Sequence, residues 1–114
     1  MNIQLYAVKK NFDQQKAERF FKERRIPVQL MDMKKHKLGR RELETFARAV
    51  GAQGLLDKED KKEHPACYYN QDGMILDAML EAPWLMRSPI VRNGNKVTVG
   101  YCPQVWEQWI AAEK

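Results

Sequence analysis

Toward its C-terminal end the chain reads WLMRSPIVR over 84–92, NGN over 93–95 and KVTVG over 96–100. The Asn93-Gly94 dipeptide separates two apolar runs. It is the strongest short-range signal for a β-hairpin, because both residues tolerate the positive φ of a type I′ turn. The stretch predicts two antiparallel strands, Pro89–Arg92 and Lys96–Gly100. A proline that opens a strand also marks a special Ser88–Pro89 bond at the edge of a site, and the sequence leaves its cis or trans state open.

The first third of the chain has the pattern of a strand, a helix and a second strand. Residues 2–8 alternate, with Ile3, Leu5 and Ala7 on one face and Tyr6 on the other. Asn11 or Asp13 can cap the helix that follows, whose buried stripe is Ala17, Phe20 and Phe21. Pro27 then opens a strand over 28–31. A strand–helix–strand unit of about 30 residues predicts that its two strands are parallel.

Three further helices are predicted, over about 40–50, over about 72–81 and from Pro103 onward. Apolar residues recur at helical spacing in each of them, Gly51 ends the first, and proline is favoured in the first turn of the last. The order of strands and helices indicates an α/β protein whose mixed sheet has helices on both faces.

Size and composition fit one domain over 1–114. The chain has 44% hydrophobic and 31% charged residues, which is ordinary for a soluble globular protein. It contains neither a stretch long and apolar enough to cross a membrane nor the pattern of a signal peptide, so we expect a cytoplasmic protein without a membrane partner. Two cysteines, Cys67 and Cys102, and two histidines have no metal-ligand spacing, so no metal is expected.

The net charge of +5 raises the question of a nucleic-acid partner. Charges alternate in sign over 58–63, which is typical of a solvated surface, and the basic stretch 34–41 lacks interleaved aromatic residues. These patterns disfavour nucleic acid. They leave an acidic partner, attracted over long range, as an expectation.

Several passages of the chain together form a recognisable pattern. They are Leu5-Tyr6 through Lys16-Ala17, Arg25–Val28, Leu38–Leu43, Glu81–Val91 and Val99–Tyr101. In this order they resemble the arsenate reductase-like (ArsC/Spx/YffB) family over nearly the whole chain. The resemblance implies a thioredoxin-like three-layer α/β/α sandwich with a mixed four-stranded sheet and an inserted helical segment at about 39–86.

The chain departs from the family pattern at the residues that carry its chemistry. Counted from Tyr6, the resemblance places the nucleophilic cysteine of the family at Asn11 and the second cysteine of the Spx-type pair at Gln14. Lys9 stands where the family usually has a proline. In the reductases a thiolate at a helix N-terminus attacks arsenate, and Asn11 offers no such nucleophile. The resemblance therefore indicates a relative that has lost the usual chemistry.

Arginines of the family pattern are also displaced. Ser88 stands at the position before the cis-like proline and Arg87 one place earlier, while Tyr101 replaces the arginine that follows the hairpin. Lys9, Lys10, Asn11 and Arg87 can still form a site for a small anion or a glutathione carboxylate beside a helix N-terminus. The alternative is that Asn11 only caps the helix and the lysines are plain surface. Ser88, Pro89 and Tyr101 complete the expected binding residues.

Cys102 is the candidate for a relocated catalytic thiol. It precedes Pro103 at the start of the last helix, where a thiol pKa is lowered, and the resemblance places this helix end close to the redox site. The alternative is an inert, buried cysteine. Cys67 is expected to pack or to lie on the surface, and His36 and His64 to be solvated.

Two functions follow from these patterns. The first is a non-catalytic binding or regulatory module with an unidentified protein partner, because Spx-type relatives act by contacting RNA polymerase. The second is a glutathione-linked oxidoreductase or arsenate reductase-like enzyme in which Cys102 or a substrate thiol reacts. No cofactor is expected, and glutathione is the candidate ligand.

Overall fold

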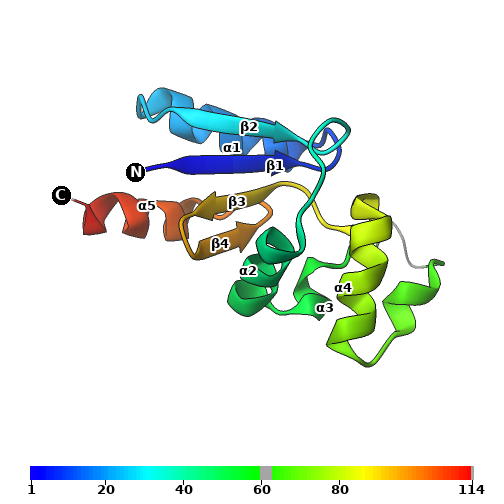
Figure 1. The fold of residues 1–114 in the computed structure, drawn as a ribbon. Coiled ribbons are helices and arrows are strands. Elements are labelled where there is room, and N and C mark those ends of the chain that lie inside the picture. The colour runs from blue at the N-terminus through cyan, green and yellow to red at the C-terminus, as the bar shows by residue number, and fades with distance from the viewer. Residues whose placement is uncertain (60–62, 114) are drawn as a thin grey trace.

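A mixed sheet of four strands forms the centre of the molecule (Figure 1). The computed structural model describes residues 1–59 and 63–113. The strands are β1 (Ile3–Ala7), β2 (Val28–Asp32), β3 (Ile90–Asn93) and β4 (Lys96–Val99), in the order β2-β1-β3-β4. β1 is parallel to β2 and antiparallel to β3, and β4 is antiparallel to β3. The predicted parallel unit and hairpin are both confirmed.

The hairpin turn differs in detail from the prediction. Asn93 belongs to β3 and pairs with Lys96, so the two central residues of the turn are Gly94 and Asn95. Only Gly94 has a positive φ, of 64°, which is the pattern of a type II′ turn with glycine at its first central position. The expected type I′ turn at Asn93-Gly94 is therefore wrong by one residue.

One face of the sheet is covered by α1 (Phe12–Glu23) and α5 (Pro103–Ala112). Aromatic side chains dominate this layer. The rings of Phe20 and Trp106 meet edge to face at 5.2 Å between centroids, and Phe20 and Phe21 do so at 5.0 Å. The buried members of this layer are Ile3, Leu5, Ala17, Phe20, Phe21, Val91, Trp106 and Trp109.

The segment that connects β2 to β3 forms a second, helical layer. Its elements are α2 (Arg40–Val50), α3 (Ala52–Leu55), η1 (Pro65–Tyr68), α4 (Asp72–Glu81) and η2 (Pro83–Leu85). Helix α2 packs on the sheet at β4, and α3 and α4 pack beside α2 (Figure 1). This layer is mostly aliphatic and includes Leu43, Phe46 and Ile75. Met74 at the start of α4 is exposed and does not belong to this layer. Of the charged run at 58–63, residues 60–62 lie outside the described residues.

A partly buried polar cluster joins β1 to α2. The hydroxyl of Tyr6 donates to Glu42 Oε2 at 2.7 Å, and the Gly39 backbone N–H donates to Glu42 Oε1 at 3.0 Å. His36 Nε2 lies 3.0 Å from both carboxylate oxygens. The expectation that His36 is solvated is wrong, because this histidine holds the 33–39 loop against the start of α2.

His64 is likewise part of the structure. Its Nδ1 accepts the Ala66 backbone N–H at the start of η1, and its ring meets Trp84 edge to face at 5.5 Å. The expectation that His64 is solvated is therefore also wrong. Trp84 itself is 51% exposed, whereas Trp106 and Trp109 are buried.

Helix α1 ends at a residue in the left-handed region. Arg25 has a φ of 56°, its N–H donates to Lys22 O, and the N–H of Ile26 donates to Phe21 O. This pair of hydrogen bonds is a Schellman motif, which usually has glycine at the left-handed position. The motif turns the chain from α1 toward β2.

No helix of the described residues has the length and apolar content of a membrane-spanning segment.

Candidate functional site

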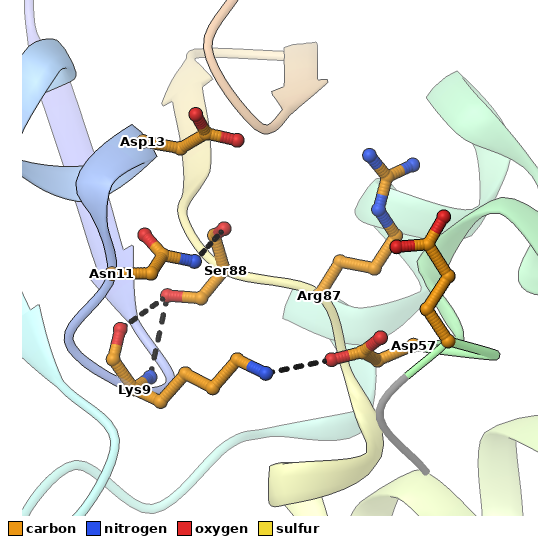
Figure 2. Close-up of a pocket in the computed structure, with 7 residues that line it drawn as sticks. Lys9, Asn11, Asp13, Asp57, Arg87 and Ser88 are labelled. Atoms are coloured by element: carbon orange, nitrogen blue, oxygen red, sulfur yellow. Dashed lines mark hydrogen bonds and ion pairs between the residues drawn. The ribbon is translucent and has the colours of Figure 1, made fainter. Parts of the chain in front are cut away.

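Ser88, just before Pro89 and the start of β3, forms hydrogen bonds with the segment between β1 and α1 (Figure 2). The Ser88–Pro89 peptide bond is cis. The hydroxyl of Ser88 accepts the N–H groups of Val8 and Lys9 at 3.1 and 3.3 Å and donates to Lys9 O at 2.9 Å. One buried side chain therefore satisfies three backbone groups of a turn that comes about 80 residues earlier.

Asn11 completes this connection from the other side. Its Oδ1 accepts the backbone N–H of Gln14 at 2.8 Å, so it is the N-cap of α1. Its Nδ2 donates to Ser88 O at 2.8 Å. Both ends of the amide therefore bond within the protein, and the side chain joins the start of α1 to the segment that contains cis-Pro89.

A third connection comes from the helical layer. Lys9 Nζ lies 2.9 Å from Asp57 Oδ2, and only 13% of the Asp57 side chain is exposed. The segment with Asp57 is itself paired to the segment before Ser88, because Arg87 N donates to Leu55 O and Asp57 N donates to Leu85 O. The α2–α4 layer therefore forms one wall of the site.

These residues surround an open cleft of about 350 Å³. Figure 2 shows Arg87 and Asp13 on opposite sides of it. Its charged groups are two cations and three carboxylates, a balance that suits a ligand with both signs of charge better than a simple anion. The lining residues are Lys9, Asn11, Asp13, Asp57, Glu59, Arg87 and Ser88.

Gly100, directly after β4, lies next to two residues of the cleft. A Cβ there would lie 3.6 Å from Arg87 Nη2 and 3.7 Å from Asp13 Oδ2, which are ordinary contacts. Its φ of +81° is the feature that favours glycine, because an L side chain would be strained in this conformation.

Cys102 is the N-cap residue of α5, as expected from the sequence. Its Sγ donates to Val99 O at 3.4 Å. Burial raises the pKa of the Cys102 thiol, and the charge of Arg87 offsets this effect only in part. The expected lowering of its pKa by the helix terminus is therefore wrong. Cys102 and Cys67 are both free cysteines.

Two expected binding residues lie outside the cleft. Lys10 lines a smaller pocket on the other side of the 8–11 turn. Tyr101, 40% exposed, lines a groove between α1 and α5, where Lys16 Nζ lies 5.6 Å from the centre of its ring. The structure therefore brings together Lys9, Asn11, Arg87 and Ser88 around the cleft. Pro89 follows Ser88 immediately before β3 but does not line the cleft, and neither do Lys10 and Tyr101.

The comparison with known families agrees with this fold. The sequence profile of the ArsC family matches residues 6–109. The chain belongs to the ArsC family. No curated protein matches it at a significant level.

Solved structures of ArsC-family proteins have the same fold. The YFFB protein is 20% identical, with a TM-score of 0.81, over 94% of this chain and 97% of its own. An arsenate reductase from Vibrio cholerae is 20% identical, with a TM-score of 0.80 and the same coverage. An arsenate reductase (ArsC) related protein from Brucella melitensis is 22% identical, with a TM-score of 0.71, over 96% of this chain and 95% of its own. The thioredoxin-like α/β architecture is thus shown.

Three acidic residues of the cleft could not be recognised as site residues from the sequence of this ArsC-family chain. Asp13 is visible in the sequence only as a candidate helix cap, and Asp57 and Glu59 stand in a charged stretch without a motif. Only the tertiary fold brings Asp57 and Glu59 to the same cleft as the β1–α1 turn. Within the described residues, no cluster of three or more His, Cys, Asp or Glu side chains could hold a metal ion.

Proposed function

We propose that this ArsC-family protein is a non-catalytic binding or regulatory module. The observation that carries the proposal is the double role of Asn11, which caps α1 and donates to the carbonyl of Ser88. The family resemblance places the nucleophile at this position. An amide here has no nucleophile to offer, and both of its polar ends are bonded within the protein.

The state of Cys102 supports the same proposal. A thiol reacts as its thiolate, and burial raises the pKa of Cys102, which lowers the thiolate fraction at neutral pH. The alternative function, a glutathione-linked oxidoreductase or arsenate reductase-like enzyme, would depend on this cysteine or on a thiol from the substrate.

The balance of charges suggests what the module binds. The protein carries a net charge of +5, so we propose an acidic protein partner in the cytoplasm, drawn to it over long range. The mixed charges of the cleft suit a zwitterionic peptide ligand, and glutathione, with two carboxylates and one ammonium group, is the candidate to test. Arg87 and Asp13 would face its opposite charges.

A turnover assay tests the absence of catalysis. The wild-type protein and the Cys102→Ser variant are incubated with arsenate and glutathione, with and without a glutaredoxin. We expect no turnover above the protein-free reaction in either case. Turnover that Cys102→Ser abolishes while the circular dichroism spectrum is unchanged would overturn the proposal in favour of the enzyme.

A binding assay tests the ligand. Glutathione at millimolar concentration should raise the melting temperature of the wild-type protein, because a ligand of the native state stabilises it by mass action. Arg87→Gln should lose this shift, and Arg41→Gln, an exposed site on α2, is the matched control. If the wild-type protein shows no shift, glutathione is not its ligand. For the protein partner, we expect an acidic protein to stay bound to the immobilised chain at low salt and to be released at high salt, because salt screens charge attraction.

A further inference from the structure

A second depression lies on the other side of the 8–11 turn from the cleft. It occupies about 130 Å³ at the carboxyl ends of the parallel strands β1 and β2, beside the first turn of α1. Ligands of open α/β sheets bind at this edge. We call it the strand-end pocket, and its lining residues are Ala7, Val8, Lys9, Lys10, Gln14, Leu30, Asp32 and Lys34.

The side chain of Gln14 in this pocket is buried without being satisfied. Gln14 is only 7% exposed, and its Oε1 has no hydrogen-bond partner among the described residues. The backbone N–H of Gln14 donates to Asn11, and this bond does nothing for the side-chain oxygen. Buried polar groups are paired in the great majority of native structures, so an unpaired Oε1 in a pocket wall indicates a hydrogen-bond donor supplied from outside.

Two lysines give the strand-end pocket a positive charge. Among the described residues, no ion pair involves the ammonium group of Lys10 or of Lys34. Asp32 also lines the pocket, but its Oδ1 accepts the Lys34 backbone N–H at 3.0 Å, which fixes the carboxylate in the turn after β2. The cleft, by contrast, holds three carboxylates and two cations. The strand-end pocket therefore suits an anion better than the cleft does.

The rest of the lining is apolar. Leu30, which is 51% exposed on the edge strand β2, lines the pocket together with Ala7 and Val8. A fully polar anion such as phosphate would leave this surface uncovered. The strand-end pocket is smaller than the cleft, at about 130 Å³ against about 350 Å³, which favours a small ligand.

We propose that the strand-end pocket binds a small hydroxycarboxylate. The carboxylate lies between Lys10 and Lys34, the short carbon chain covers Leu30, and the hydroxyl donates the hydrogen bond that Gln14 lacks. Small-molecule sites commonly combine an apolar lining with a few convergent polar groups. This pocket shares only Lys9 with the lining of the cleft, and the proposal does not rest on the proposed function.

The ligand series lactate, propionate and lactamide tests each part of this proposal by NMR titration of the full chain. We expect saturable amide shifts at 7–14 and 30–34. Lactate should bind at least 5-fold more tightly than propionate, which lacks the hydroxyl, and lactamide, which lacks the charge, should not bind. Equal affinities for lactate and propionate, or lactate shifts centred on Arg87 and Asp57, would overturn the assignment.

Variants separate the site from the fold. Lys10→Gln with Lys34→Gln should weaken lactate binding at least 10-fold, and Arg87→Gln, in the cleft, should leave it unchanged. Gln14→Met keeps the volume and removes the orphaned amide, so it should raise the melting temperature and abolish the preference for lactate over propionate. If Gln14→Met lowers the melting temperature or keeps that preference, the role of Gln14 is wrong. Because glutathione is tested at Arg87, failure of one site leaves the other intact.

Discussion

Ser88 and Gln14 are both buried polar residues at the 8–11 turn, with 6% and 7% of their surfaces exposed. On the Ser88 side, the hydroxyl makes three hydrogen bonds and the carbonyl accepts a fourth from Asn11. On the Gln14 side, the side-chain oxygen makes none with the described residues. The contrast shows that the polar groups of Asn11 and Ser88 are bonded within the protein, while the unpaired oxygen of Gln14 lies on the other side of the turn.

The largest effect on stability is expected at Tyr6 of β1, whose hydroxyl is hydrogen-bonded to Glu42. Burial, together with the hydrogen bond to Glu42, raises the pKa of Tyr6 to about 12 from an ordinary value near 10. Between these values the unfolded chain loses the proton that the folded chain keeps, so stability falls as the pH rises. The full loss is about 3 kcal/mol, of which about 2 kcal/mol falls between pH 10 and 12.

Urea unfolding at several alkaline pH values measures this loss, and Tyr6→Phe is the reference because it cannot ionise. Equal pH slopes for the two proteins would show that the hydroxyl of Tyr6 titrates normally.

At the acid end, burial alone would raise the pKa of Glu42, but its hydrogen bonds from Gly39, Tyr6 and His36 lower it. Its contribution is therefore present above the ordinary carboxylate range and is lost as the pH falls through the lowered pKa.

The second prediction removes the hydrogen bonds of the Ser88 hydroxyl. Ser88→Ala removes the hydroxyl that serves Val8 and Lys9, so two backbone N–H groups and one carbonyl lose a partner. We expect a loss of about 2 kcal/mol in the free energy of unfolding. Thr45→Ala is the control, since its hydroxyl bonds to Arg41 O on the surface and should contribute less than about 0.5 kcal/mol. Similar losses for both variants would contradict the special role of Ser88.

The third prediction divides the two bonds of Asn11. Asn11→Ala removes the helix cap and the bond to Ser88, and should cost about 1.5 kcal/mol. Asn11→Ser keeps a capping oxygen and loses only the bond to Ser88, so its cost should be the smaller of the two. Chemical denaturation of the two variants makes the comparison. If serine is as destabilising as alanine, the cap contributes nothing.

The smallest effect belongs to the far end of α1. Arg25 occupies a left-handed position at a φ of 56°, which costs a non-glycine residue about 1 kcal/mol. Arg25→Gly relieves this cost but gives the unfolded chain more freedom, so we expect a net gain of about 0.5 kcal/mol. The same substitution at the neighbouring Arg24, which has a φ of −95°, should destabilise. A stabilising Arg24→Gly would overturn this explanation.

The fold was predictable because it rests on local signals. The alternation in 2–8, the stripe of Ala17, Phe20 and Phe21, and the glycine of the hairpin each act within a few residues of sequence. The type II′ turn escaped prediction because strand pairing extends β3 through Asn93, which shifts the turn by one residue.

The site was predictable only in part, because its residues meet through the tertiary fold. The cap by Asn11 is local and was visible, but its second bond joins residues 77 positions apart. The sequence places Lys9 and Lys10 together, whereas the cleft is lined by Lys9 but not by Lys10, and Lys9 is paired there with Asp57. The thiol of Cys102 depends on its burial, which a helix-start pattern does not reveal.

The placement of the three tryptophans gives the molecule its own optical reporters. Trp84 is half exposed, touches the ring of His64 and lies three residues before Arg87, while Trp106 and Trp109 are buried in the opposite layer. A soluble quencher such as iodide should therefore reduce the fluorescence of Trp84 and leave the fluorescence of Trp106 and Trp109 largely unchanged. Fluorescence can then follow the helical wall of the cleft separately from the aromatic layer, without any attached dye.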